Sequence, residues 1–155
     1  RIPRTNVCDV FDENYEFDFC KVKVVEDGSD VTVITNGETL AEVIEAAEIL
    51  KQEGYSVQIL HAPVVKPLDG ATIIEKAKQT KFVITVENHS IIGGLGSAVC
   101  ELLAEYYPMP VQRIGINDTF GQSGKWDYLL EYYGLTANKL AKTIKKHIDT
   151  YRLVK

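Results

Sequence analysis

Residues 30–60 read DVTVITNGETLAEVIEAAEILKQEGYSVQIL, and the spacing of their apolar side chains indicates the architecture of the chain. DVTVIT (residues 30–35) is a β-branched run that predicts a buried strand. Residues 38–53 place apolar side chains at the three-and-four spacing of one helix face, and Gly54 ends that helix. SVQIL (residues 56–60) again predicts a strand. This order forms a βαβ unit, in which the two strands run parallel.

Strands and helices continue to alternate beyond residue 60. The patterns predict strands over residues 81–86 and 111–116, helices over 69–79, 95–106, 125–133 and 137–151, and loops over 87–94 and 117–124. KVKVV (residues 21–25) predicts a further strand, which can pair only antiparallel with the next strand or elsewhere in the sheet, because a short turn separates the two. The expected fold is therefore α/β, a mostly parallel sheet with helices on both faces.

Composition narrows the class of protein. The 155 residues are 45% hydrophobic and 25% charged, which is typical of one ordinary globular domain. The formal net charge of −5 weighs against a nucleic-acid partner and against an anionic membrane surface. The apolar runs are far shorter than the roughly 20 residues of a membrane helix.

The cysteines and the first residue bear on the cellular context. Cys8, Cys20 and Cys100 are widely spaced, and no His lies at zinc-site spacing from them. We therefore expect reduced thiols in a cytoplasmic protein, with neither a disulfide nor a metal site. The chain opens on Arg1 rather than Met and shows no secretory leader, so we expect a fragment or a processed chain.

Residues 87–97 (ENHSIIGGLGS) join a predicted strand to a predicted helix and are the sharpest candidate site. Backbone N–H groups at a helix N-terminus can bind an anion, but the glycine spacing matches neither GxGxxG nor a P-loop. Two interpretations stay open: a tight turn that allows close packing, or a phosphate cradle. Glu87 and His89 share one side of an extended segment and could form an acid–base pair.

Three other segments carry candidate groups. Arg1 and Arg4 have guanidinium groups suited to phosphate or carboxylate, unless they belong to a solvated arm. In FGQSGKW (residues 120–126), Ser123 is expected to cap the next helix rather than contact a ligand. The basic last helix is expected to present a solvated face. No nucleophile elbow, HExxH motif or calcium loop is present, so the residues alone indicate no catalytic set.

Together, these segments resemble the C-terminal domain of transketolase over nearly the whole chain. The strings that carry the resemblance are DVTVITNG (30–37), AAEILKQEG (46–54), KPLD (66–69), TVENH (85–89), GGLGSAV (93–99), FGQSG (120–124) and YGL (133–135). RIPRT (residues 1–5) resembles the end of the preceding, pyrimidine-binding domain. The resemblance implies an entry arm over residues 1–20 and a transketolase C-terminal domain over residues 21–155.

The resemblance also implies a fold and an activity. The fold is a three-layer α/β/α domain with a mixed sheet of about five strands, one of them antiparallel. The parent enzyme uses thiamine diphosphate and Mg²⁺ to transfer a two-carbon ketol unit between sugar phosphates in the pentose phosphate pathway, and the cofactor carries the difficult chemistry. The implied partners are the cofactor-binding domains or subunit of the same enzyme, and the full enzyme is expected to be a homodimer.

The family's signature for diphosphate and metal, Gly-Asp-Gly followed by a distant Asn, has no match here. The nearest string is Glu26-Asp27-Gly28, and the family's cofactor-activating glutamate lies in the preceding domain. We therefore expect the isolated chain to bind no cofactor and to carry no catalytic residue. Arg4 matches the family's arginine that binds the substrate phosphate. The possible loop site comprises His89, Gly93, Gly94 and Ser97.

Two alternatives stay open beside transketolase. One is the corresponding domain of deoxyxylulose phosphate synthase or of a 2-oxoacid dehydrogenase beta subunit, although His89 together with GGLGSAV favours transketolase. The other is a non-catalytic regulatory or assembly module, which is also the expected role of the isolated chain.

Overall fold

The computed structural model describes residues 8–153 and places strand β2 (Val31–Thr35), which is buried along its whole length, at the centre of a five-stranded sheet. β3 (Val57–His61) and β4 (Val83–Ser90) run parallel to β2 on either side. β1 (Lys23–Glu26) pairs antiparallel with β3, and β5 (Val111–Ile116) pairs parallel with β4. The order β1-β3-β2-β4-β5 confirms the expected mixed sheet with one antiparallel strand.

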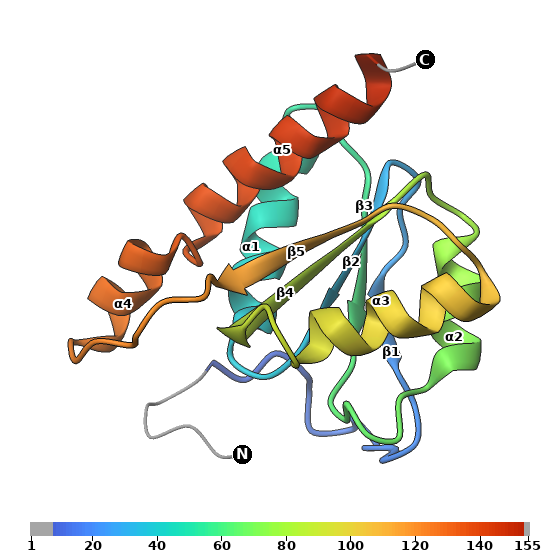
Figure 1. Ribbon diagram of the computed structural model, residues 1–155, viewed down its shortest axis with the longest axis horizontal. Coiled ribbons are helices and arrows are strands. Elements are labelled where there is room, and N and C mark those ends of the chain that lie inside the picture. Colours follow the sequence, from blue (N-terminus) through green and yellow to red (C-terminus); the bar gives the residue numbers. More distant parts are fainter. Residues whose placement is uncertain (1–7, 154–155) are drawn as a thin grey trace.

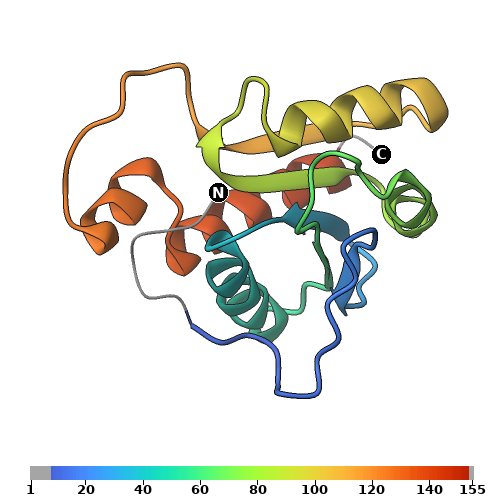
Figure 2. The same ribbon diagram turned by 90° about the horizontal axis from the view of Figure 1, so that it is seen from below.

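Helices cover both faces of the sheet (Figure 1 and Figure 2). α1 (Thr39–Gln52), α4 (Trp126–Tyr133) and α5 (Ala137–Leu153) contribute to the core on one face. α2 (Gly70–Ala77) and α3 (Leu95–Tyr106) contribute to the core on the other face. The expected three-layer α/β/α architecture is confirmed.

Side-chain alternation along the strands gives each layer its own core. Val33 packs among the residues of α1 and α5, including Leu50 and Ile144, whereas its neighbour Ile34 packs with Leu103 of α3. Each of these side chains is almost fully buried, and burying a side chain of this size stabilises the fold by about 1.5–3 kcal/mol. A central strand that is apolar on both faces therefore needs helices on both sides.

Two local predictions differ from the structure. β4 continues to Ser90, which pairs with Ile116 of β5 after an irregularity in register, so the predicted loop over residues 87–94 is shorter than expected. Ser123 does not cap α4, because the N-cap residue is Lys125 and its side chain makes no capping hydrogen bond.

The connections place loops from both faces at one end of the sheet. The chain passes from β2 into α1 on one face and from β4 into α3 on the other. Where neighbouring parallel strands send their helices to opposite faces, a crevice opens at the carboxyl ends of the strands, and ligands commonly bind there. In the described part of the chain, none of the helices combines the length and apolar character required to cross a membrane.

Candidate functional site

Glu87 holds the N-terminus of α3. It lies in β4, and its side chain is 1% exposed. Its two carboxylate oxygens accept hydrogen bonds from the backbone N–H groups of Leu95 and Gly96, each at 2.8 Å. The first N–H groups of a helix lack partners within the helix and, with the helix dipole, attract an anion. The chain's own carboxylate therefore occupies the position that a bound phosphate would need at this turn.

The two glycines of the turn have different roles. A Cβ atom at Gly94 would overlap Glu87 Oε2 and would lie 2.8 Å from the Cδ atom of the same carboxylate. Gly93 has a φ of +79°, in the left-handed region that glycine adopts without strain. Both lie between β4 and α3, which confirms the predicted strand–loop–helix turn.

Side-chain hydrogen bonds fix the short loop between β4 and α3. Ser97 Oγ accepts a hydrogen bond from the N–H of Gly93 at 2.8 Å. Arg113 of β5 donates from Nη1 to the carbonyl oxygen of Ile91 at 2.7 Å. Arg113 was not among the residues expected from the sequence, although a lone arginine within the otherwise uncharged strand VQRIGI was a usable signal. Because Ser97 is bound inside the loop, its observed contacts are structural.

His89 does not pair with Glu87. Its ring is exposed, and Nδ1 lies 3.0 Å from the carbonyl oxygen of Ser90. Both oxygens of Glu87 are already hydrogen-bonded at the start of α3. The acid–base pair considered from the sequence is therefore not formed.

A pocket of about 400 Å³ lies in the crevice between the loops that follow β2 and β4. His89, Gly93 and Gly94 line it, together with Asn36 and Glu38 from the other loop. This is the location at which ligands bind in open α/β sheets. That the loop residues bind a ligand stays a prediction, and Arg4 lies outside the described residues.

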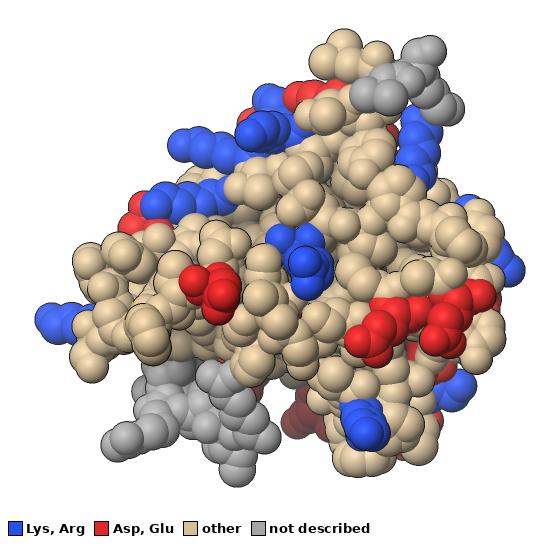
Figure 3. Space-filling model, viewed as in Figure 1, with Lys and Arg blue, Asp and Glu red and all other residues tan. Residues whose placement is uncertain are grey.

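Charged side chains gather over particular elements of the surface. Lys and Arg residues cluster along α5, and Asp and Glu residues gather over α3 (Figure 3). On α5, Arg152 pairs with Asp30 at 2.8 Å, and that contact helps to lower the pKa of the Asp30 carboxyl despite the opposing effect of burial. On α5, Lys139, Lys145 and Arg152 form ion pairs with Glu131, Glu53 and Asp30 of the same chain.

The described residues do not fit the binding of thiamine diphosphate, neither of its diphosphate group nor of the metal ion that is bound with it. Within residues 8–153, no group of three or more His, Cys, Asp or Glu side chains could hold a metal ion. The α3 N-terminus already holds Glu87. Asp27, in the string nearest to the family signature, pairs instead with Lys76 at 2.8 Å. We therefore assign no step of cofactor chemistry to these residues.

The chain belongs to the transketolase family, and residues 20–140 match the family model described as "Transketolase, C-terminal domain". A putative transketolase C-terminal section from Methanocaldococcus jannaschii is 45% identical over 151 residues, which cover 96% of this chain and 47% of that protein. 1-Deoxy-D-xylulose-5-phosphate synthase from Heliobacterium modesticaldum is 40% identical over 131 residues, which cover 84% of this chain and 20% of that protein.

A solved structure titled "Split gene transketolase, inactive beta4 tetramer" superimposes with a TM-score of 0.87 and 40% sequence identity. The match covers 94% of this chain and 48% of that structure. The chain thus spans about half the length of this structure and of the Methanocaldococcus relative. The comparisons confirm the C-terminal-domain resemblance and relate this chain to both transketolases and deoxyxylulose phosphate synthases.

Proposed function

We propose that this chain is the C-terminal part of a transketolase that transfers a two-carbon ketol unit between sugar phosphates. The observation that carries the proposal is the 45% identity, over 151 residues, to a transketolase C-terminal section. In the proposed assembly, other domains or a second subunit of the same enzyme bind thiamine diphosphate and Mg²⁺, and the thiazolium ring supplies the carbanion chemistry. The complete enzyme is expected to be a cytoplasmic homodimer.

The proposed role of this chain within that enzyme is assembly rather than catalysis. The support is the Glu87 carboxylate, which closes the anion position at the start of α3. A rigid domain with two packed cores can still position neighbouring domains. The chain therefore completes the enzyme without contacting the reacting atoms.

Reconstitution tests this division of labour. Ketol transfer from a ketose phosphate to an aldose phosphate is measured for this chain, for the polypeptide with the cofactor-binding domains, and for the mixture. We expect turnover in the mixture and none with this chain alone. Calorimetry of this chain with thiamine diphosphate and Mg²⁺ is the companion measurement. A Kd below about 100 μM, roughly −5.5 kcal/mol, would contradict the proposed division.

A second candidate is deoxyxylulose phosphate synthase, because that enzyme from Heliobacterium modesticaldum is 40% identical over 131 residues. The same reconstituted mixture distinguishes the two candidates by its product. For a transketolase, we expect a ketose phosphate that is two carbons longer than the aldose phosphate acceptor. When pyruvate and glyceraldehyde 3-phosphate are supplied in place of the two sugar phosphates, formation of 1-deoxy-D-xylulose 5-phosphate with release of CO₂ would select the second candidate.

We also propose that Arg4 binds the phosphate of the sugar substrate in the complete enzyme. A hydrogen bond to a charged group contributes about 1.5–3 kcal/mol, so Arg4→Ala should lower kcat/KM for phosphorylated substrates about 10- to 150-fold. The change should appear in KM, with kcat nearly constant, if the contact is equal in the ground and transition states. Unphosphorylated ketoses should lose little.

Arg1→Ala is the matched control, since it removes the same type of side chain three positions earlier. It should leave both substrate classes nearly unaffected. Equal, small effects of Arg4→Ala on phosphorylated and unphosphorylated substrates would place Arg4 in a solvated arm instead.

A further inference from the structure

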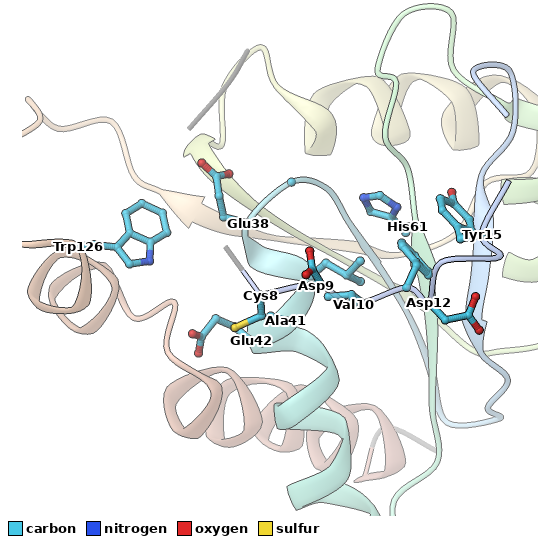
Figure 4. A pocket seen from close by; sticks show the side chains of 13 residues that line it. Cys8, Asp9, Val10, Asp12, Tyr15, Glu38, Ala41, Glu42, His61 and Trp126 are labelled. Carbon is cyan, nitrogen blue, oxygen red and sulfur yellow. The ribbon is translucent and has the colours of Figure 1, made fainter. Parts of the chain in front are cut away.

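A pocket of about 490 Å³ lies beside the loop that follows β2, on the α1 side of the sheet (Figure 4). Residues 8–12 form one wall, and the first turn of α1 forms another. His61, the last residue of β3, and Trp126, the first residue of α4, also line it. The volume falls within the roughly 300–1,000 Å³ range of small-molecule sites.

The lining is mainly apolar and includes three aromatic side chains. Phe11 and Tyr15 stack with their ring centroids 4.1 Å apart, and Trp126 is contributed by α4. Val10 and Leu40 add aliphatic surface. Large aromatic surfaces favour a ligand with an apolar or aromatic body.

Within residues 8–153, every charged residue that lines the pocket is acidic. These residues are Asp9, Asp12, Glu38 and Glu42, and Figure 4 shows them distributed around the pocket. Glu42 also accepts a hydrogen bond from the N–H of Ala137 at 2.6 Å, which fixes its carboxylate at the start of α5. A concave surface lined by charges of one sign concentrates ions of the opposite sign, so this pocket favours a cation.

His61 contributes its ring to the pocket wall. Its Nδ1 atom is buried and has no hydrogen-bond partner within residues 8–153, and its ring lies 5.8 Å from that of Phe11. Burial lowers the pKa of His61, which favours the neutral imidazole with one donor and one acceptor nitrogen. A neutral ring does not repel a cation, and it adds aromatic surface to the lining.

We propose that this pocket binds a small organic cation with an aromatic or apolar body. The ammonium group faces the carboxylates, and the body packs against Phe11, Leu40 and Trp126. Binding of such a cation goes beyond the proposed ketol transfer, whose sugar phosphates are anions, and adds a second binding activity to the chain.

Trp126 is the single tryptophan of the 155 residues, so its fluorescence reports on the pocket directly. The chain is titrated with phenethylamine, with uncharged 2-phenylethanol and with anionic 3-phenylpropanoate, three probes that share a phenyl ring. We expect phenethylamine to bind at least about tenfold more tightly than the anion, with the alcohol between them. Equal or tighter binding of the anion overturns the cation assignment, and no binding of phenethylamine up to about 10 mM overturns the site.

Two leucine substitutions test the location. Ala41 lines the pocket, so Ala41→Leu should fill part of it and weaken phenethylamine binding at least about tenfold. Ala104 is exposed on α3 and is the matched control, for which Ala104→Leu should leave binding unchanged. Equal effects of the two substitutions would overturn the assignment of binding to this pocket.

A third variant tests the charge. Asp12→Asn keeps the shape of a lining side chain and removes its negative charge. It should reduce the preference for phenethylamine over 2-phenylethanol and leave binding of the alcohol nearly unchanged. An unaltered preference would contradict the role of the carboxylates. Because ketol transfer is not measured, failure of the proposed enzyme activity would not affect these results.

Discussion

The turns that follow β4 and β2 both join a buried parallel strand to a helix through a glycine. They differ in whether an acidic side chain is hydrogen-bonded to the N-terminus of that helix. After β4, the carboxylate of Glu87 binds the first N–H groups of α3, and Gly94 leaves the space that it needs. After β2, the N-cap residue of α1, Glu38, makes no side-chain capping hydrogen bond. The larger pocket lies beside this second turn.

The difference depends on where each strand places its polar side chains. β4 carries Glu87 at a position from which the carboxylate reaches the helix that follows. β2 ends at Thr35, whose hydroxyl bonds to that of Thr39 at 2.7 Å and reaches no further into α1. A glycine-containing turn between a strand and a helix is thus a structural joint when the strand supplies an anion. Where the strand supplies none, room is left for other groups.

Removing the Glu87 carboxylate from the turn between β4 and α3 should have the largest effect on the free energy of unfolding. Glu87→Ala leaves two buried N–H groups without partners and should lower the free energy of unfolding by about 3 kcal/mol. Urea denaturation measures the change. Glu101→Ala, on the exposed side of α3, is the control and should change stability by less than about 0.5 kcal/mol. Similar losses in the two variants would contradict the role of Glu87.

Crowding the Glu87 carboxylate should lower the free energy of unfolding somewhat less than removing it. Gly94→Ala places a Cβ atom against Glu87 and should destabilise the chain by about 2 kcal/mol, a typical cost of overpacking. In the Glu87→Ala background the clash is absent. The loss of stability in the double variant should therefore be smaller than the sum of the two single losses by at least about 0.5 kcal/mol. Strict additivity in a double-mutant cycle would show that the clash is not with Glu87.

Substitution of Gly37, in the turn between β2 and α1, should also lower the stability of the chain, but for a different reason. Gly37 has a φ of +56°, and a Cβ atom added there would meet no neighbouring side chain or backbone within 4 Å, so Gly37→Ala introduces backbone strain without a clash. We expect a loss of about 1 kcal/mol in unfolding free energy. Gly37→Asn should lose about half as much, because Asn tolerates the left-handed region better than Ala. An equal loss for the two variants would argue against backbone strain as the cause.

The smallest expected effect is on the pH dependence of stability. Burial lowers the pKa of His61 from its ordinary value of 6.5, so the unfolded chain binds more protons than the folded chain as the pH falls below that value. Stability therefore decreases on acidification from about pH 7 to pH 5, and His61→Leu should make that decrease shallower. Urea midpoints at several pH values measure the slope.

His147 contributes to the same slope, because burial and then the neighbouring Lys146 lower its pKa. His147→Leu should therefore flatten the decrease separately, and the double variant should flatten it further. An unchanged slope in His61→Leu would show that His61 does not remain preferentially neutral in the folded chain.

Sequence patterns predicted most of the fold because they depend on local physics. Apolar residues at helical spacing predicted α1, and a β-branched run predicted β2. Asp69 was correctly expected to begin α2, where its side chain accepts the N–H of Thr72. The predicted end of β4 was wrong. Ser90 pairs with Ile116, which is remote in sequence, and this pairing extends the strand through a polar stretch.

The site was less predictable. The glycines of the β4–α3 turn were evident in the sequence, and so was the strand that precedes them. The hydrogen-bond partners of Glu87 were not evident. Sequence spacing allowed a pair with His89, two residues away, whereas the folded chain brings Leu95 and Gly96 to the carboxylate. His61 was also missed, although its place directly after a predicted parallel strand put it at the carboxyl edge of the sheet.

The order of elements, the α/β class, the family motifs and the negative charge follow from the amino-acid sequence without coordinates, since they are properties of neighbouring residues and composition. The tertiary structure decided which carboxylate binds α3 and which histidine nitrogen has no hydrogen-bond partner within residues 8–153. It also brought residues 8–12, α1, β3 and α4 together around the larger of the two pockets. The physical reason is that hydrogen-bond satisfaction and enclosed volume depend on distances between segments, and only the packed sheet sets those distances.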